Sequence, residues 1–195
     1  ALEAGWLGRG LDLRADDPDL SNDATQTLWR LGGDARAGAA TVRLSGGQVR
    51  GDRAETDGGF ETASARSHQS SADLSARFAW AQANLTAGVS FERDAIQTRP
   101  QFADPLSVSE DQGAAYLIGQ APLFSHVTAT ASVRADHYAS FGAHTTFQLG
   151  AVADFEALRV FASYGTAFKA PSLSERFEQS FFNHGNPDLK PEDSR

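Results

Sequence analysis

Apolar and polar residues alternate with a period of two along most of this chain. In the row from Val127 to Val133, every second residue is Val or Ala, and Thr128, Thr130 and Ser132 lie between them. Similar rows occupy residues 74–80, 85–91 and 147–155, and weaker rows occupy residues 2–14, 25–31, 41–50 and 113–120. Successive side chains of a β-strand point to opposite faces, so this pattern predicts strands and not amphipathic helices. We expect an all-β chain of roughly nine strands.

The predicted connections between these strands differ in length. Long connections are expected at 15–23, 51–60, 99–112 and from 170 onward, and short ones at 32–38, 81–83, 121–125, 139–143 and 155–157. Apart from 139–143, long and short connections alternate. This arrangement is typical of an antiparallel up-and-down meander with long loops at one end and tight turns at the other. Transmembrane β-barrels of outer membranes are built in this way, with tilted strands of about ten residues.

The two faces of the predicted strands differ in polarity. The row opposite the apolar one contains charged residues, including Arg77, Glu92, Arg134 and Asp136. A soluble β-sandwich would bury apolar side chains between its sheets, whereas a membrane barrel turns its polar row to the lumen and its apolar row to lipid. The pattern therefore favours part of a transmembrane outer-membrane β-barrel. In it, the apolar residues of the Val127–Val133 row face lipid, and Arg134 faces the lumen.

Composition and charge exclude several classes of function. The 195 residues contain no cysteine and no methionine, which removes disulfides, thiolate metal ligands and cysteine nucleophiles. A formal net charge of -8 argues against nucleic acid as a partner, since no basic surface is available to neutralise phosphates. No cofactor is indicated and no catalytic constellation stands out, so we do not expect an enzyme.

Three short motifs have structural interpretations that are simpler than their functional ones. Residues 44–48 read LSGGQ, the signature string of ABC-type ATPases, but the sequence lacks the Walker A loop that such an ATPase needs. Residues 50–52 form the cell-adhesion tripeptide RGD within a charged segment. His137 and His144 flank a short connection, yet two histidines without further ligands do not make a metal site. We assign no metal to the chain.

The last third of the chain carries the most specific sequence. Residues 162–177 read ASYGTAFKAPSLSERF, and residues 185–192 read GNPDLKPE. This pair of segments resembles TonB-dependent outer-membrane receptors, in which a strand ending in YGTAFKAP is followed by a loop and an NPDLKPE box. Residues 116–123 and 132–142 resemble the preceding strand and hairpin of the same family. Before these segments, only the barrel pattern and the alternation of connections agree with it.

The NPDLKPE box has a physical interpretation of its own. It consists of Asn186, Pro187, Asp188, Leu189, Lys190, Pro191 and Glu192. Each proline removes a backbone donor and favours an extended residue before it, and an Asn-Pro pair favours the start of a turn. We interpret the box as a segment that shapes the barrel rim, where the chain passes from an outer loop into the next strand. Direct ligand contact is the alternative.

The resemblance implies a function for the protein that contains this chain. It would be a receptor in the outer membrane of a Gram-negative bacterium that binds a scarce, bulky solute, such as an iron–siderophore, haem or cobalamin, and imports it with energy transmitted by TonB. Its partners would be that small-molecule ligand, for example a metal chelate, outer-membrane lipid, and TonB through a plug region. A non-transporting outer-membrane barrel and a soluble β-binding or adhesion module are the alternatives.

The resemblance also bears on domain organisation. Transporters of this type have about 22 strands around a plugged lumen. We therefore expect residues 1–195 to be a partial barrel that contains no plug domain.

Aromatic or polar residues of the expected loops are the candidate ligand contacts. They are Phe102, Tyr138, Phe141, Phe181, Phe182 and His184. Residues 99–112 and 170–184 are expected on the outer surface, because long loops at one mouth of a barrel can close on a bulky ligand whereas tight turns cannot reach it. Ordinary loop packing of these side chains is the alternative.

Overall fold

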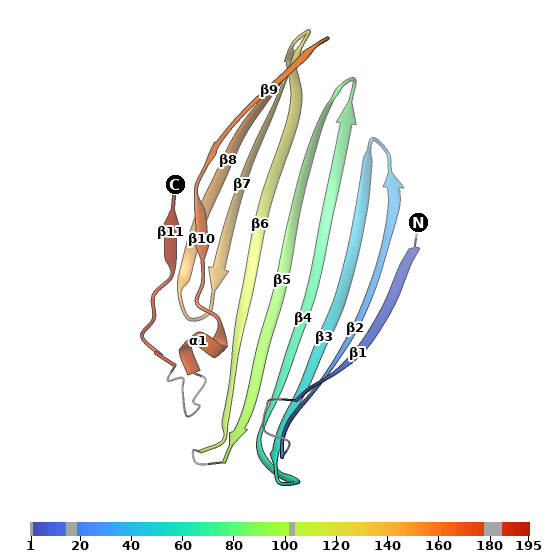
Figure 1. The fold of residues 1–195 in the computed structure, drawn as a ribbon. Helices are drawn as coiled ribbons and strands as arrows, with labels where there is room; N and C mark the ends of the chain where they lie inside the picture. Colours follow the sequence, from blue (N-terminus) through green and yellow to red (C-terminus); the bar gives the residue numbers. More distant parts are fainter. Residues whose placement is uncertain (1, 15–18, 102–103, 178–184) are drawn as a thin grey trace.

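Nine strands form a single antiparallel sheet in which neighbours in the chain are neighbours in the sheet (Figure 1). The computed structural model describes residues 2–14, 19–101, 104–177 and 185–195, with side chains from Asp19 onward except Leu20. The strands of this sheet are β1 (Leu2–Arg14), β2 (Leu20–Ala37), β3 (Ala40–Asp57), β4 (Phe60–Trp80), β5 (Ala83–Pro100), β6 (Leu106–Phe124), β7 (Val127–Tyr138), β8 (Gly142–Phe155) and β9 (Leu158–Gly165). The predicted antiparallel meander is confirmed.

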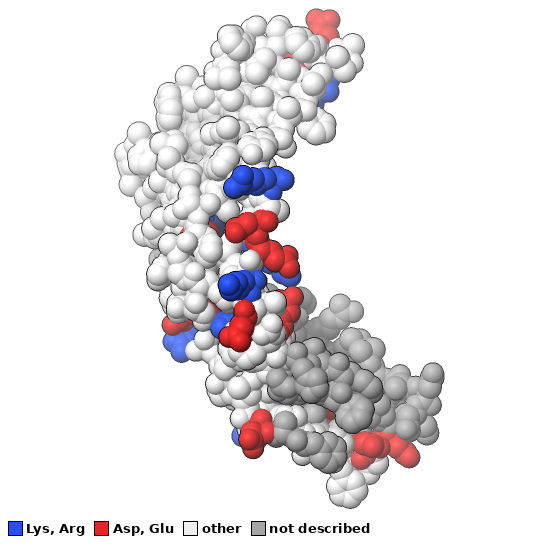
Figure 2. Space-filling view, turned by 90° about the vertical axis from the view of Figure 1, so that its left-hand side faces the viewer, with Lys and Arg blue, Asp and Glu red and all other residues white. Residues whose placement is uncertain are grey.

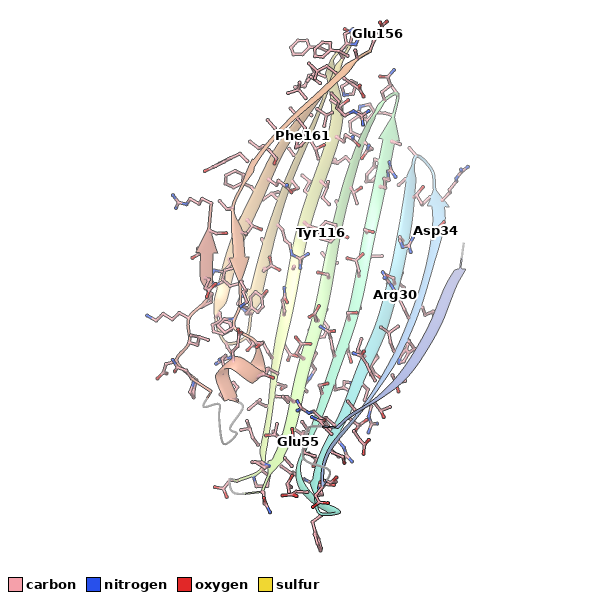
Figure 3. All side chains as sticks on the ribbon, viewed as in Figure 1. Arg30, Asp34, Glu55, Tyr116, Glu156 and Phe161 are labelled. Atoms are coloured by element: carbon pink, nitrogen blue, oxygen red, sulfur yellow. The ribbon has the colours of Figure 1, made fainter. Side chains whose placement is uncertain are left out.

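The chain after β9 forms a smaller unit beside the sheet. Strands β10 (Ala167–Lys169) and β11 (Glu192–Ser194) pair with each other, and the helix α1 (Leu173–Phe177) lies between them in the chain. The connections at 38–39, 81–82, 125–126 and 156–157 form one end of the large sheet, called the turn end here. The connections at 58–59 and 139–141, together with the ends of β5 at Pro100 and β6 at Leu106, form the loop end. Figure 3 shows Glu156 at the turn end, Tyr116 near the middle and Glu55 toward the loop end.

The connections of the loop end are shorter than the sequence pattern predicts. β3 runs to Asp57 and β4 begins at Phe60, so the expected long loop at 51–60 is wrong. Gly58 and Gly59 join the two strands with φ values of +56° and +82°, as a two-residue hairpin turn requires. The expected loop at 99–112 is likewise mostly strand, since β5 ends at Pro100 and β6 begins at Leu106.

The strand segment from Gly51 to Asp57 escaped prediction because both of its faces are polar. From Gly51 to Asp57, β3 contains no row of apolar residues. Arg53 Nε donates a hydrogen bond to Asn22 Oδ1 on β2 at 3.0 Å, and the hydroxyls of Ser21 and Thr56 are 2.6 Å apart. The backbone ladder and such cross-strand pairs hold the strands together without an apolar face, and a period-two pattern needs one.

One face of the sheet is apolar and has no core packed against it. Leu117 on β6 lies opposite Ala87 and Val133, and Val133 lies opposite Phe147, so these side chains share a face. Large exposed side chains on this face include Trp29, Leu31, Leu44, Leu74, Val89, Phe91, Leu117, Val133, Phe147 and Leu149. Within the described residues, Ala40 is the one buried hydrophobic residue. The sheet therefore needs an apolar surrounding, such as lipid.

The apolar face ends toward the loop end. On β4 it comprises Trp80, Phe78, Ala76, Leu74 and Ala72, and it is followed by Ser70, His68 and Arg66. The distance from Trp80 to Ala72 is about 27 Å at about 3.4 Å per residue, close to the apolar band of about 25 Å in membrane barrels. Near this edge, Trp29 Nε1 donates to Gln48 Oε1 and Gln48 Nε2 donates to Ser70 Oγ, both at 3.3 Å. Such a tryptophan is typical of a membrane–water interface.

The opposite face is polar and concave. Figure 2 shows charged side chains on the concave side of the molecule, whereas the upper part of its convex side is almost free of them. Arg134 lies opposite Tyr116 and Thr146, one position out of phase with the Val133 row. The predicted separation of Val133 and Arg134 onto opposite faces of the sheet is thus found in the structure.

Candidate functional site

A hydrogen-bond network crosses several strands in the middle of the concave face. Tyr116 of β6 lies over Gly88 of β5, and its hydroxyl donates to the carboxylate of Asp73 on β4, with 2.9 and 3.2 Å to the two oxygens. A Cβ at Gly88 would lie only 2.4 Å from Cζ and from the hydroxyl oxygen of Tyr116. A larger residue at this crossing would therefore displace the Tyr116 side chain from its place over the strand.

Arg134 and Asp136 of β7 continue this network. Asp136 Oδ1 accepts hydrogen bonds from Arg134 Nε at 2.9 Å and from Gln112 Nε2 at 2.8 Å. Arg134 Nη2 also donates to Ser90 Oγ at 3.3 Å. Asp136 is buried, and these donors offset the free-energy cost of burying its carboxylate.

A hollow of about 320 Å³ opens beside this network. Its polar lining includes Ser45, Ser71, Asp73, Glu92, Gln112 and Arg134. These side chains offer both donors and acceptors, so the hollow is suited to water or to the polar groups of a solute. Among the residues that the structure describes, no three His, Cys, Asp or Glu side chains are grouped as a metal site would require.

An aromatic cluster lies at the loop end of the concave face, and we call it the rim cluster. It consists of Tyr138 at the end of β7, Phe141 in the β7–β8 turn, His144 on β8 and Phe168 on β10. The rings of Tyr138 and Phe141 meet edge to face at 6.2 Å, and His144 stacks on Phe168 at 3.8 Å. The ring of Phe168 also lies 5.5 Å from that of Tyr138. Aromatic surfaces of this kind suit the apolar parts of a bulky ligand.

Arg176 of α1 joins the rim cluster to the sheet. Its Nη1 atom lies 3.3 Å from Glu110 Oε2 on β6, and both side chains are only 12% exposed. The guanidinium carbon also lies 4.6 Å from the ring centroids of Phe141 and Phe177. The segment after β9 therefore contacts the concave face through an enclosed ion pair and a cation–π contact.

A capping box begins α1. Ser172 N and Ser172 Oγ both donate to Glu175 Oε2, at 2.8 and 2.9 Å, and Glu175 N donates to Ser172 Oγ at 3.2 Å. These bonds satisfy backbone groups that the first turn of a helix leaves open. The hydrogen bonds from Ser172, the backbone one first, and the nearby ammonium of Lys169 hold the pKa of the Glu175 carboxyl below its ordinary value.

The NPDLKPE box contacts α1 and β10. Asn186 N donates to Glu175 O at 3.0 Å, and Asn186 Oδ1 accepts from Asp188 N at 3.0 Å. At the other end of the box, Glu192 pairs with Lys169 in the β10–β11 ladder. These are contacts of a supporting segment, and its role in shaping the rim stays a prediction.

The structure describes two of the predicted ligand contacts, Tyr138 and Phe141, and brings them together in the rim cluster. Their contact with a ligand stays a prediction. Phe102, Phe181, Phe182 and His184 lie outside the described residues. Glu110, Phe168 and Arg176 were not among the residues predicted from the sequence, and His144 was considered there only as a metal ligand. Phe168 and Arg176 belong to the segment that carries the family resemblance, which was the available signal, but no sequence pattern pairs Arg176 with Glu110.

The short motifs are parts of strands in the structure. LSGGQ and RGD both lie within β3, where Arg50 pairs with Asp52 at 3.0 Å. His137 lies opposite Ala143, whereas His144 lies opposite Asp136, so the two imidazoles point to opposite faces of the sheet. They cannot bind one ion together. In the part of the chain that the structure describes, no helix is both long and apolar enough to cross a membrane.

Comparison with known proteins gives one family and several relatives. The family model described as "TonB dependent receptor-like, beta-barrel" matches residues 4–195. The vitamin B12 transporter BtuB of Vibrio vulnificus (strain YJ016) is 38% identical over 115 residues, which are 57% of this chain and 18% of that protein. This chain thus spans less than a fifth of that relative.

Solved structures of siderophore receptors have the same fold as this chain. PirA of Pseudomonas aeruginosa superposes with a TM-score of 0.68 at 16% identity, covering 98% of this chain and 41% of that one. PirA of Acinetobacter baumannii has a TM-score of 0.70 at 11% identity, covering 98% and 39%. At these identities the likeness concerns the fold alone.

Proposed function

The chain belongs to the TonB-dependent receptor-like β-barrel family. On this premise, we propose that it forms part of the barrel wall of a receptor that binds and imports a scarce, bulky solute. The observation that carries the proposal is the family match over residues 4–195. The receptor lies in the outer membrane of a Gram-negative bacterium. Its convex face contacts lipid, its concave face lines the lumen, and TonB supplies energy through a plug region.

Cobalamin is the first solute to test. The relative with 38% identity is a vitamin B12 transporter, whereas the likeness to siderophore receptors is one of fold. The rim cluster offers aromatic surfaces, and the polar wall below it offers donors and acceptors. This combination suits a large ring system with polar side groups. Within it, Tyr138 and Phe141 are the proposed ligand contacts.

The test is uptake by cells of a Gram-negative strain that lacks its own cobalamin receptor and expresses the full-length protein. We expect radiolabelled cyanocobalamin to bind at the cell surface and to accumulate in the cells. Deletion of TonB should stop accumulation and leave surface binding intact. A ferric siderophore offered in parallel is the specificity control.

Two results would contradict the proposal. Surface binding with no TonB-dependent accumulation of either solute would favour a non-transporting barrel. Recovery of the folded protein from the aqueous fraction without detergent would favour a soluble binding or adhesion module.

A further inference from the structure

Three segments that are distant in the chain meet at Arg176. Its guanidinium group pairs with Glu110 on β6, 66 positions away, and lies over the ring of Phe141 in the β7–β8 turn. The pair is enclosed on both sides, with each side chain 12% exposed. In the pair Arg93–Asp111, by contrast, the side chains are 56% and 45% exposed. Enclosed ion pairs of fixed geometry constrain structure more than exposed ones do.

The second oxygen of Glu110 holds the β7–β8 turn. Glu110 Oε1 accepts a hydrogen bond from Ser140 N at 2.8 Å, and the neighbouring Ala139 N donates to Asp111 O at 3.0 Å. Glu110 thus contacts the turn with one oxygen and α1 with the other. Phe141 belongs to this same turn, and its ring contacts both the guanidinium group of Arg176 and the ring of Tyr138.

The positive charge of Arg176 also reduces the repulsion between two carboxylates in the sheet. Asp94 on β5 lies directly opposite Glu110 on β6. Two carboxylates in directly opposite positions of a ladder repel each other. A cation supplied from α1 compensates this repulsion, which gives α1 an electrostatic reason to dock at this position of the concave face.

Gly185 and the first residue of the NPDLKPE box, Asn186, pack against α1. Asn186 N donates to Glu175 O, and Gly185 packs so closely that a Cβ there would lie 2.6 Å from Phe177 N. A side chain at Gly185 would therefore displace the end of α1. Through these contacts the segment holds Arg176 toward Glu110.

We propose that Arg176 is a positioning residue that locks α1 and the β7–β8 turn into one unit at the rim. Arg176, Glu110, Phe141 and the backbone of Ser140 form this unit, here called the clasp, and the NPDLKPE segment supports it. The clasp fixes the place of Tyr138 and Phe141, and it acts on ligand binding through them. This last step rests on the proposed function, whereas the docking of α1 does not.

The docking is tested with spin labels in the full-length receptor. Ser174→Cys on α1 and Ala139→Cys in the turn introduce the label sites, and these 195 residues contain no other cysteine. Any cysteine elsewhere in the full-length receptor is first replaced by serine. We expect both labels to be immobile in the parent and mobile in Arg176→Glu and in Glu110→Arg. The double variant Arg176→Glu/Glu110→Arg restores the ion pair and should make the Ser174→Cys label immobile again. The turn label should regain less order, because an arginine at position 110 cannot accept the hydrogen bond of Ser140 N. The matched control is Arg93→Glu, which breaks an exposed ion pair on the other face and should leave both labels unchanged.

The positioning role is tested by equilibrium binding of cyanocobalamin to whole cells. If Arg176→Glu leaves the rim ordered for a tenth of the time, the dissociation constant rises about tenfold. The double variant should reverse part of this rise, because it restores the ion pair and not the hydrogen bond of Ser140 N. Arg176→Lys keeps the charge and loses the planar stacking, so an intermediate value is expected. A heat-modifiability gel confirms that each variant forms a folded barrel.

The outcomes separate this proposal from the proposed function. Labels that stay immobile in Arg176→Glu overturn the clasp, whatever the ligand. Mobile labels with unchanged affinity overturn the positioning role. A parent receptor that binds no cyanocobalamin overturns the proposed ligand, and in that case the label result alone decides whether the clasp exists.

Discussion

The convex and concave faces of this sheet are built from the same strands and are stabilised in different ways. On the convex face, side chains such as Leu117 and Leu149 are exposed and form no packed core. On the concave face, Tyr116 reaches across Gly88 to Asp73 by a directed hydrogen bond. The stability of the convex face therefore depends on the apolar medium around it. The stability of the concave face depends on the distances and angles of hydrogen bonds between neighbouring side chains. A substitution has to be judged by the face on which it falls.

The largest expected effect is that of a charge on the convex face. Ala131→Arg places a guanidinium group in the middle of the apolar row of β7 and should cost about 2–4 kcal/mol of stability in lipid. The adjacent Ser132→Arg points to the concave face and should cost less than about 1 kcal/mol. Urea unfolding of the full-length receptor in lipid vesicles measures both values. Equal losses for the two variants would refute the assignment of faces.

The next effect is that of volume on the concave face. Gly88→Ala inserts a Cβ against the ring of Tyr116 and should cost about 1–3 kcal/mol. Gly113→Ala is the matched control, since no atom lies within 4 Å of its added Cβ. The same urea titration applies, and the second substitution Tyr116→Ala should recover part of the loss. If Gly88→Ala proves as mild as the control, the crossing over Gly88 is not a tight one.

A smaller effect is expected from breaking one polar pair on the concave face. Asp136→Ala leaves donors of Arg134 and Gln112 without their acceptor and should cost about 1–2 kcal/mol, because Arg134 keeps partial access to solvent. Asp52→Ala removes the exposed carboxylate paired with Arg50 and Arg66 and should cost less than about 1 kcal/mol. Unfolding curves of the two variants compare enclosed with exposed pairing directly. A larger loss for Asp52→Ala would reverse the comparison.

The smallest effect concerns pH at the rim. The pKa of Glu175 is lowered in the folded protein, chiefly by hydrogen bonds from Ser172. Its contribution to the ordering of α1 is therefore complete above the pKa of the unfolded chain and is lost as the pH falls through the lower folded value. Mobility of a spin label at Ser174→Cys should rise over this acidic range. Glu175→Gln should weaken that dependence, and Glu156→Gln at the turn end should leave it unchanged.

The strands within the apolar band could be predicted because the period of two is local. In an extended strand, the position of each residue of the Val127–Val133 row decides the face to which its side chain points. One face contacts lipid and the other does not, so the row alternates between apolar and polar residues. The strand segments from Gly51 to Asp57 and from Leu106 to Gln112 could not be predicted in this way. Both faces of the first segment are polar, and the second has only Leu106 and Val108 as apolar residues. The partners that extend each ladder lie on other strands.

The candidate site also has a part that the sequence predicted and a part that only the structure revealed. The sequence by itself was sufficient to place Tyr138 and Phe141 beside a short connection and to mark residues 162–192 as family-specific. It could not bring Arg176 to Glu110, since that pair depends on how the sheet curves and where the chain turns after β9. Side-chain direction is a property of a few consecutive residues, whereas an enclosed ion pair exists only after distant segments have taken their places in space.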